Sequence, residues 1–306
     1  MKKNTLLILM AMGIVSGTQA CDICGCGVGN NYIGILPDFN RHIIGLRFRY
    51  NSLLTHVGVG GATSYLTTRE KYSTVEFWGG WNIGKKFRLM ASIPYSFDEK
   101  ENQGNKQTKN GLGDITMTGY YQVINSRKAK GNTMLVQSLW VGAGIKAPTG
   151  KYNPTDKSGT AESANLFQLG TGSTDFTLNL LYDFRLQDAG INVSAAYKMN
   201  TTNSHGYNYG NKLNATAQLY YKFRIKNKFT IAPNAGIIFE KGGRDIDNTL
   251  PVDISGGNLT MGLAGLELGF KSIAIGGNFQ TPFAQSLANG IVKARNRAMI
   301  HVSFLL

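Results

Sequence analysis

Cysteine is nearly absent from this 306-residue chain: its three cysteines stand at positions 21, 24 and 26, and none follows. Any thiol chemistry is therefore confined to one short stretch near the amino terminus. Proline is scarce, with 7 residues, whereas glycine is frequent, with 38. No long apolar run occurs after the first twenty residues. Because a membrane-spanning helix needs about 20 such residues, no further membrane helix is expected.

Histidine is also scarce, and acidic residues are outnumbered. The 32 basic and 18 acidic residues give a net charge of +14, but the basic residues are scattered, so no nucleic-acid partner is predicted. A hydrolase built into a barrel would need a histidine near a serine and a carboxyl group. None of the four histidines has such a partner at a spacing that sequence can show: His42, His56, His205 and His301. We predict that the protein is not an enzyme.

The first twenty residues have the pattern of an export signal. Lys2 and Lys3 give a positive start, residues 6–15 form a short apolar core, and small residues stand at the two cleavage positions before Cys21. The apolar core is too short to span a membrane. We predict that residues 1–20 are removed and that the mature protein works in an oxidising compartment.

Alternation of apolar and polar residues dominates the rest of the chain, as in a half-buried strand. In FRLMASIPYSF, residues 87–97, every odd-numbered residue is apolar or aromatic. No helical periodicity is visible. Twelve strands are predicted, at residues 42–53, 70–83, 87–97, 112–125, 133–147, 174–186, 191–200, 212–225, 229–240, 258–270, 273–280 and 295–306.

The connections between these segments alternate in length. Those after even-numbered segments are short turns, and those after odd-numbered segments are long loops. This asymmetry and the even strand count predict an all-β fold, a transmembrane antiparallel up-and-down β-barrel of the outer-membrane type with about 12 strands. The barrel is predicted to cover residues 42–306. Residues 21–41 would form a cysteine-rich periplasmic segment or plug. An exported soluble β-sandwich is the alternative, but it has no need of such asymmetry.

The uncharged face of each segment is predicted to contact outer-membrane lipid, because twelve strands closed around a purely apolar interior would leave a void. The charged face would line a pore with Arg47, Arg49, Glu76, Asp114, Asp175, Lys222, Arg224, Arg295 and Arg297. These charges could form cross-strand ion pairs that stiffen the wall, since unpaired charge in a narrow interior is costly. Alternatively, the four arginines of the first and last strands could make a positive strip that favours anions.

Two local features depart from simple alternation. Pro94 and Pro233 fall inside predicted strands, where we expect bulges because a closed barrel has no free edge. In residues 258–270 both faces are apolar, so placing Glu267 inside either brings Met261 and Leu263 inside or requires a register shift.

Three motifs at loop-to-strand junctions carry a resemblance to a known family. They are GLGDIT (residues 111–116), VGAGIKAPTGKY (141–152) and LGTGSTDF (169–176). With these the chain resembles the outer-membrane β-barrel transporters named for the MetA pathway of phenol degradation. The resemblance implies a channel for small solutes, with hydrophobic compounds as candidates, and the positive strip adds anionic compounds to them.

The CDICGC stretch is not part of that pattern. Its spacing lets the thiolates of Cys21, Cys24 and Cys26 converge on one centre, which suits a soft ion, Cu(I) first and Zn(II) second. His301 is a candidate fourth ligand at the periplasmic mouth. A disulfide would use two of the three thiols, and a lipid anchor on Cys21 is a further alternative. The motif could gate the channel, or metal binding could be the protein's main function.

Overall fold

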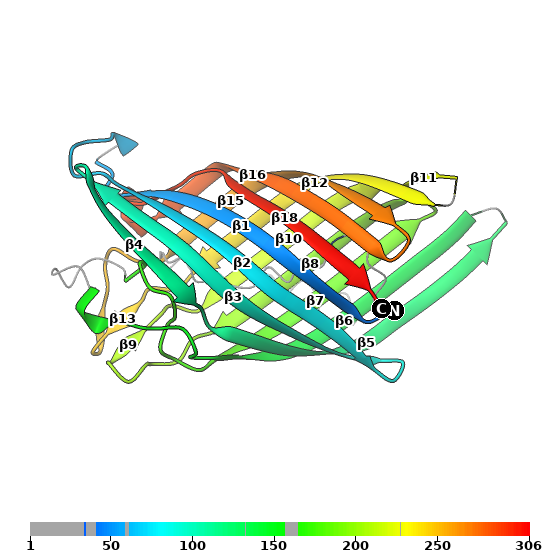
Figure 1. Ribbon diagram of the computed structural model, residues 1–306, viewed down its shortest axis with the longest axis horizontal. Coiled ribbons are helices and arrows are strands. Elements are labelled where there is room, and N and C mark those ends of the chain that lie inside the picture. The colour runs from blue at the N-terminus through cyan, green and yellow to red at the C-terminus, as the bar shows by residue number, and fades with distance from the viewer. Residues whose placement is uncertain (1–33, 35–40, 59–60, 132, 157–164, 227) are drawn as a thin grey trace, which may run out of the picture.

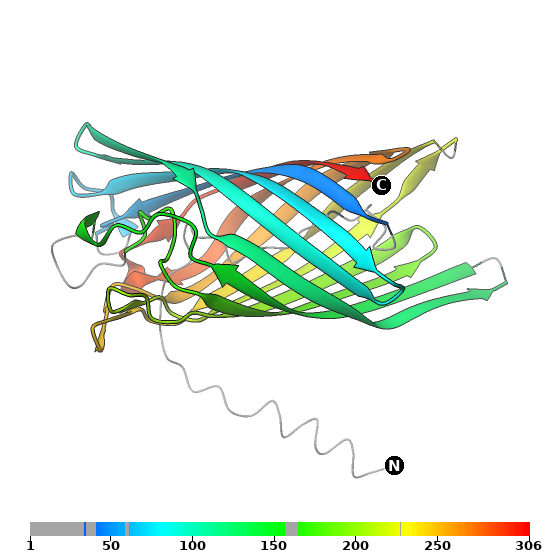
Figure 2. The ribbon, with the colours of Figure 1, turned by 60° about the horizontal axis from the view of Figure 1, so that its bottom comes forward.

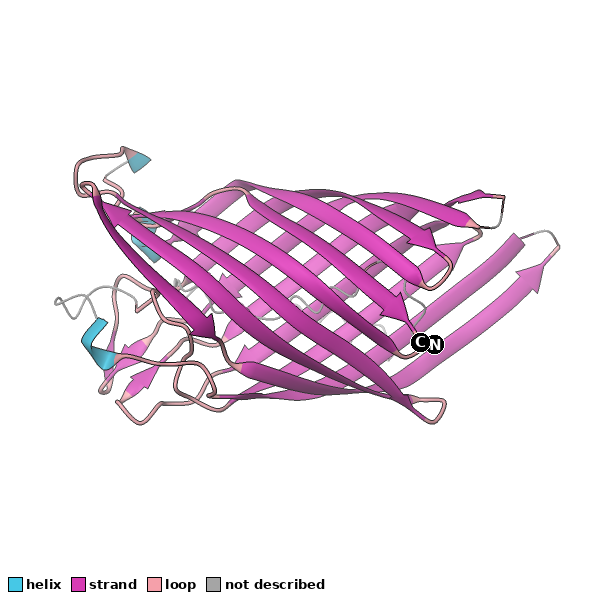
Figure 3. Ribbon diagram, viewed as in Figure 1, coloured by secondary structure: helices cyan, strands magenta, loops and turns pink. Residues whose placement is uncertain are grey.

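The computed structural model describes residues 34, 41–58, 61–131, 133–156, 165–226 and 228–306. Strands make up nearly all of its regular structure (Figure 3). Twelve long strands form the wall: β1 (Ile43–Thr55), β2 (Thr68–Ile83), β3 (Phe87–Asn102), β5 (Ile115–Lys130), β6 (Thr133–Ala147), β7 (Asp175–Leu186), β8 (Ala189–Met199), β10 (Lys212–Tyr221), β12 (Phe229–Gly242), β15 (Gly257–Phe270), β16 (Ile273–Leu287) and β18 (Arg297–Leu305). Within the described residues, no helix is long and apolar enough to cross a membrane.

The wall closes on itself, as Figures 1 and 2 show. Strand β1 pairs with β2 on one side and with β18 on the other, so that Arg47 lies between Glu76 and His301. Strand β10 pairs with both β8 and β12, which joins the two ends of the strand order. Every long strand is therefore paired on both sides, as a spanning sheet requires. The predicted twelve-stranded antiparallel barrel is confirmed.

The two ends of the barrel differ. Short turns and the carboxyl terminus lie at one end, and the long loops gather at the other (Figure 1). In outer-membrane barrels the short turns face the periplasm, which orients the molecule. The shorter elements β4 (Asn105–Leu112), β9 (Tyr207–Asn208), β13 (Ile246–Asp247), β14 (Leu250–Pro251), β17 (Lys293–Ala294), η2 (Pro154–Asp156) and η3 (Ala288–Gly290) belong to the extracellular end, and β11 (Phe223–Ile225) to the periplasmic end.

Residues 98–111 were expected to be a loop, and the structure corrects this. Strand β3 continues to Asn102 and pairs with β4 in a hairpin that projects from the wall. Gln103 and Gly104 at its tip both have positive φ, 49° and 79°. Two such residues make the tight turn whose twist suits a hairpin. The charged residues of this segment can form a strand because they lie outside the membrane.

The two prolines do not bulge their own strands as expected. Pro94 pairs in register with Glu76, and on its other side β4 ends and β5 begins. Pro233 pairs in register with Leu266, and the break between β10 and β11 lies on its other side. Because proline has no N–H to donate, the neighbouring strand is interrupted where that bond would form.

Side chains alternate between the two faces of the wall. On the outside, large apolar residues such as Phe48, Phe77 and Ile145 are 41%, 50% and 45% exposed. On the inside, Arg47 and Lys146 are buried. The outer surface therefore forms the apolar band that contacts lipid, and polar groups are turned inward.

Candidate functional site

The arginines of β1 point into the barrel interior. The Glu76 carboxylate on β2 forms ion pairs with Arg47 at 3.1 Å and with Arg49 at 3.3 Å. The Arg47 side chain is 3% exposed, whereas that of Arg49 is 20% exposed. Since two guanidinium groups share one carboxylate, this part of the wall keeps an excess of positive charge. Arg49 is the more accessible of the two.

Two further contacts join strands that are not neighbours, across the inner face of the strands between them. Arg297 of β18 donates to both carboxylate oxygens of Glu240 on β12, at 2.7 and 3.1 Å, although β15 and β16 stand between them in the wall. His301 Nε2 lies 2.9 Å from Oε1 of Glu267 on β15. Gly276 on the intervening β16 leaves space for this pair, since a Cβ there would lie 2.4 Å from His301 Nε2. These contacts brace the wall and narrow the lumen.

Two of the predicted pore residues lie toward the periplasmic end. Arg224 is exposed on β11 and forms an ion pair with Asp188 at 3.0 Å. Lys222 is partly buried, with Nζ 5.2 Å from the centre of the Tyr220 ring. Tyr220 is itself buried and donates to the Asp183 carboxylate at 2.9 Å.

Arg295 does not occupy the expected inward position. It is exposed, and its N–H donates to the carbonyl of Ser52 at 2.9 Å. The reason is a bulge: four steps separate Ala294 from Ala298, but only three separate their partners Leu53 and Tyr50 on β1. The extra residue reverses the alternation, so Ala294 and Arg297 face inward and Arg295 does not.

The three family-like motifs meet at the extracellular end around Asp114. Its Oδ2 accepts from Lys146 Nζ at 2.5 Å, from the Thr171 N–H at 2.9 Å and from the Thr171 hydroxyl at 3.1 Å. Its Oδ1 accepts from the Gly150 N–H at 3.0 Å. Residues from GLGDIT, GIKAPTGK and LGTGSTDF thus share one carboxylate. We name Asp114, Lys146, Gly150 and Thr171 the motif clasp.

The clasp continues into the wall and depends on close backbone packing. Lys146 also contacts Asp175 at 2.8 Å, and Asp175 contacts Lys198 at 3.0 Å. Position 170 requires glycine, because the two ends of the loop approach each other there. A Cβ on Gly170 would lie 2.5 Å from Asp114 Oδ1 and 2.6 Å from the Gly150 carbonyl oxygen. Asp114 and Asp175 therefore hold both ends of the long loop between β6 and β7.

Apolar side chains fill the extracellular end of the interior. We name this group the mouth cluster; each member is at most 7% exposed, and it consists of Leu53, Tyr72, Leu166, Phe167, Ile238, Leu259, Met261, Leu263, Leu287, Ala288, Val292 and Ala294. Most members project from the wall, but Leu166 and Phe167 come from the loop between β6 and β7. Met261 and Leu263 face inward together with Glu267, and a register shift also occurs between Thr260 and Met261.

Lys109 on β4 fixes Phe167 in this cluster. Its Nζ lies 4.5 Å from the centre of the Phe167 ring and donates to the Phe167 carbonyl. The same ammonium group forms an ion pair with Asp156 at 2.6 Å. The projecting hairpin and the long loop are thereby joined over the mouth.

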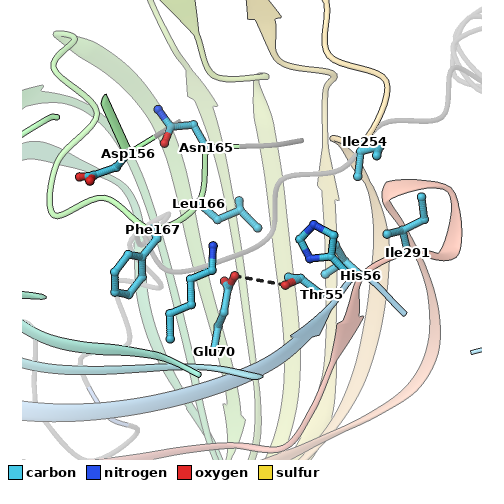
Figure 4. Close-up of a pocket in the computed structure, with 11 residues that line it drawn as sticks. Thr55, His56, Glu70, Asp156, Asn165, Leu166, Phe167, Ile254 and Ile291 are labelled. Carbon is cyan, nitrogen blue, oxygen red and sulfur yellow. Dashed lines mark hydrogen bonds between the residues drawn. The ribbon is translucent and has the colours of Figure 1, made fainter. Parts of the chain in front are cut away.

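A cavity of about 40 Å³ lies beside Leu166 and Phe167. Figure 4 shows Thr55, His56 and Glu70 on one side of it, and Thr55 donates to the Glu70 carboxylate at 3.2 Å. Such a volume accommodates water rather than an aromatic ring. Leu166 and Phe167 therefore pack closely against the wall residues of the mouth cluster beside this small cavity.

The predicted thiol site, Cys21, Cys24 and Cys26, lies outside the described residues. His301, its expected fourth ligand, lies within the wall, four residues before the end of β18 and in contact with Glu267. Among the described residues, no three His, Cys, Asp or Glu side chains come together as a metal site.

Sequence reasoning missed the mouth cluster and the clasp partner Thr171. The loop residues Leu166 and Phe167 are adjacent apolar residues within a polar loop, and that was the available signal. Thr171 gave none of its own, because its contact with Asp114 joins positions 57 residues apart.

Comparison with known proteins gives the family. Residues 55–270 match the family described as the MetA-pathway of phenol degradation. The chain belongs to this family. All three motifs lie within the matched residues, so the predicted resemblance is confirmed. No curated protein matches the sequence of this family member.

A solved channel structure shares the fold of this member of the phenol-degradation family. An outer membrane channel from Pseudomonas putida F1 has a TM-score of 0.61 and 13% identity, with 89% of this chain and 100% of that chain covered. The β domain of the Bordetella autotransporter BrkA has a TM-score of 0.46 and 11% identity, with 87% and 100% covered. The monoaromatic hydrocarbon channel CymD has a TM-score of 0.40 and 8% identity, with 87% of this chain and 89% of that chain covered. The family match and the barrel fold shared with the Pseudomonas putida channel fit the predictions of an outer-membrane location and of a channel-type barrel rather than an enzyme.

Proposed function

We propose that the protein is a gated outer-membrane channel for small solutes that combine an apolar body with a polar or anionic group. The observation that carries this proposal is the order of layers along the interior. The mouth cluster is apolar, and the wall below it carries buried ion pairs with the accessible Arg49. A solute with both kinds of surface could contact each layer in turn.

The gate is proposed to be the Leu166–Phe167 segment. Leu166 and Phe167 are the members that come from the loop between β6 and β7, whereas most of the other members belong to the wall strands. The motif clasp holds the loop near Gly150 and Thr171. Displacing Leu166 and Phe167 would therefore open the mouth without unfolding the barrel, while the ends of the loop stay fixed.

The channel is proposed to have a weak preference for anions. The predicted strip of four arginines is reduced here, because Arg295 faces away, Arg297 is matched by Glu240, and Arg47 and Arg49 share Glu76. One net positive charge near an accessible guanidinium group can attract a carboxylate without trapping it.

Single-channel recording in planar bilayers tests the gate. Replacing a buried phenylalanine by alanine costs about 3–5 kcal/mol of packing energy. If about 1.4 kcal/mol of this cost falls on the closed state alone, the ratio of open to closed channels rises tenfold. Phe167→Ala should therefore raise the ratio of open to closed time at least about tenfold. Tyr65→Ala is the matched control, since Tyr65 is 75% exposed in a loop at the same end. Equal open probabilities in Phe167→Ala and wild type would refute the gate.

The solute class is tested on the same channel. Sodium benzoate and sodium acetate carry the same charged group, but only benzoate has an aromatic body. Benzoate should reduce the single-channel current in a concentration-dependent way, and acetate at the same concentration should not. Identical currents in the two salts, after correction for bulk conductivity, would remove the apolar-solute proposal.

The amino-terminal residues have two proposed roles. We propose that residues 1–20 are the cleaved signal and that residues 21–41 form a periplasmic segment that can cover the pore. Three cysteines within six positions support a soft-metal site, for Cu(I) or Zn(II), as a second candidate function.

A further inference from the structure

Exposed lysines surround the periplasmic end of the barrel. They lie in three of the short turns: Lys85 and Lys86 between β2 and β3, Lys226 and Lys228 between β11 and β12, and Lys271 between β15 and β16. We name these five residues the basic rim. Within the described part of the chain, none of the five has an ion-pair partner. Asp188, in the short turn between β7 and β8, is paired with Arg224.

The extracellular end is different. There, Glu99 pairs with Lys71 at 3.1 Å and with Lys106 at 2.7 Å, and Asp253 pairs with Arg244 at 3.5 Å. The protein thus balances much of its loop charge at one end and leaves positive charge exposed at the other. An excess of exposed positive charge points to an anionic partner at the periplasmic end.

The depth of the basic rim is set by aromatic residues. Phe87 and Tyr121 are paired on the outer surface with ring centres 5.0 Å apart, and Phe229 stacks on Phe270 at 4.5 Å. All four are at least 37% exposed. Aromatic girdles of this kind mark the level of the lipid headgroups in outer-membrane barrels.

Two of the five lysines lie against these same outer rings. Lys86 Nζ is 5.8 Å from the centre of the Tyr121 ring, and Lys271 Nζ is 5.3 Å from that of Phe270. Both distances fall within the range of a cation–π contact. The ammonium groups are therefore held beside the lipid-facing surface at the depth of phosphate groups. A soluble acidic protein approaching along the barrel axis would not need lysines in this sideways position.

We propose that the basic rim binds the phosphate groups of anionic phospholipids in the periplasmic leaflet of the membrane. The site would prefer phosphatidylglycerol or cardiolipin over zwitterionic phosphatidylethanolamine, because the rim has positive charge to neutralise. Its attraction is electrostatic, so it should weaken at high salt. Loss of one lysine near such a surface should weaken the preference roughly fivefold.

Tryptophan fluorescence offers a direct test. The chain has three tryptophans; Trp78 and Trp140 are 1% and 3% exposed, whereas Trp81 is 50% exposed on the outer surface. Trp81 belongs to the same β2–β3 hairpin as Lys85 and Lys86. Brominated lipid that collects around these lysines should therefore quench Trp81.

The full-length protein would be reconstituted in phosphatidylethanolamine bilayers containing a fixed fraction of brominated phosphatidylglycerol or of brominated phosphatidylethanolamine. In wild type, brominated phosphatidylglycerol should quench more strongly. Adding 1 M NaCl should reduce the difference, because the screening length is then about 3 Å. The Lys85→Gln/Lys86→Gln variant should lose most of the difference. Lys71→Gln/Lys106→Gln removes the same charge from the extracellular end and should keep it. Heat-dependent gel mobility checks that each variant is folded.

Three results would overturn the proposal. Equal quenching by the two brominated lipids in wild type would show no lipid preference. An unchanged preference in Lys85→Gln/Lys86→Gln would place the lipid elsewhere. Loss of the preference in sodium phosphate, but not in sodium chloride of the same ionic strength, would show a site for free anions. An acidic periplasmic protein as the true partner would give the first of these results.

Discussion

The motif clasp makes a quantitative prediction for Asp114→Asn. The aspartate accepts four hydrogen bonds, three of them at Oδ2. An asparagine can keep only one acceptor oxygen, and it does best by facing that oxygen toward Lys146 and Thr171. Its NH2 group then meets the Gly150 N–H, donor against donor. Removing one partner of a buried ion pair costs about 3–5 kcal/mol, and a lost buried hydrogen bond about 1–3 kcal/mol.

The expected loss of stability lies between these two ranges. Lys146 keeps its contact with Asp175 at 2.8 Å, so its charge does not become isolated. We therefore expect Asp114→Asn to lower the free energy of unfolding by about 2–4 kcal/mol. The measurement is urea unfolding of the refolded protein in detergent micelles, followed by the fluorescence of the buried Trp78 and Trp140. Amide exchange at Gly150 and Thr171 should accelerate at the same time.

Glu99→Gln is the matched control. It also removes a carboxylate with two lysine partners at the extracellular end, but on the exposed hairpin, where ion pairs contribute little. Its unfolding midpoint should stay at the wild-type value. If the two variants unfold at the same urea concentration, or if the Gly150 and Thr171 amides exchange at wild-type rates in Asp114→Asn, the clasp does not hold the loop.

Two further outcomes are expected. Tyr220→Phe removes the hydroxyl that donates to the Asp183 carboxylate at 2.9 Å and should destabilise the barrel by about 1–3 kcal/mol, whereas Tyr221→Phe, next to it on the lipid face, should change the thermal midpoint little. Protein purified under reducing conditions should contain copper or zinc, and a Cys21/Cys24/Cys26→Ser variant should not; equal metal content by elemental analysis would end the soft-metal proposal.

The barrel could be predicted because its signals are local and repeated. Alternation assigns a face to each residue, and the lengths of the loops assign an end to each turn. The misassigned positions are those where neighbouring strands change register. The bulge beside Arg295 depends on how β18 meets β1, and the breaks opposite Pro94 and Pro233 depend on the adjacent strand. A single sequence shows each strand but not the neighbour that sets its register.

The site could be predicted only in outline for a related reason. Alternation places Arg47 and Glu76 on inward faces, but it does not show that Arg49 shares the same carboxylate. The Arg297–Glu240 contact crosses two intervening strands. Leu166 and Phe167 enter the barrel from a loop, whose path is set by Lys109 and the clasp rather than by its own pattern. Contacts across an interior depend on barrel diameter and tilt, which no local pattern encodes.

The positions of the motifs also limit what the family resemblance can say about the solute. The three motifs converge on Asp114, whose hydrogen-bond donors are loop backbone, Thr171 and Lys146. None of these groups lies in the mouth cluster, and Phe167 and Arg49 fall outside all three motifs. What the motifs form in this chain is therefore the anchor of the loop, not the surface that a solute would touch. A channel can keep this anchor and change its solute by altering the mouth cluster alone. For that reason the phenol-degradation name does not fix the substrate of this chain, and the currents in benzoate and acetate must decide it.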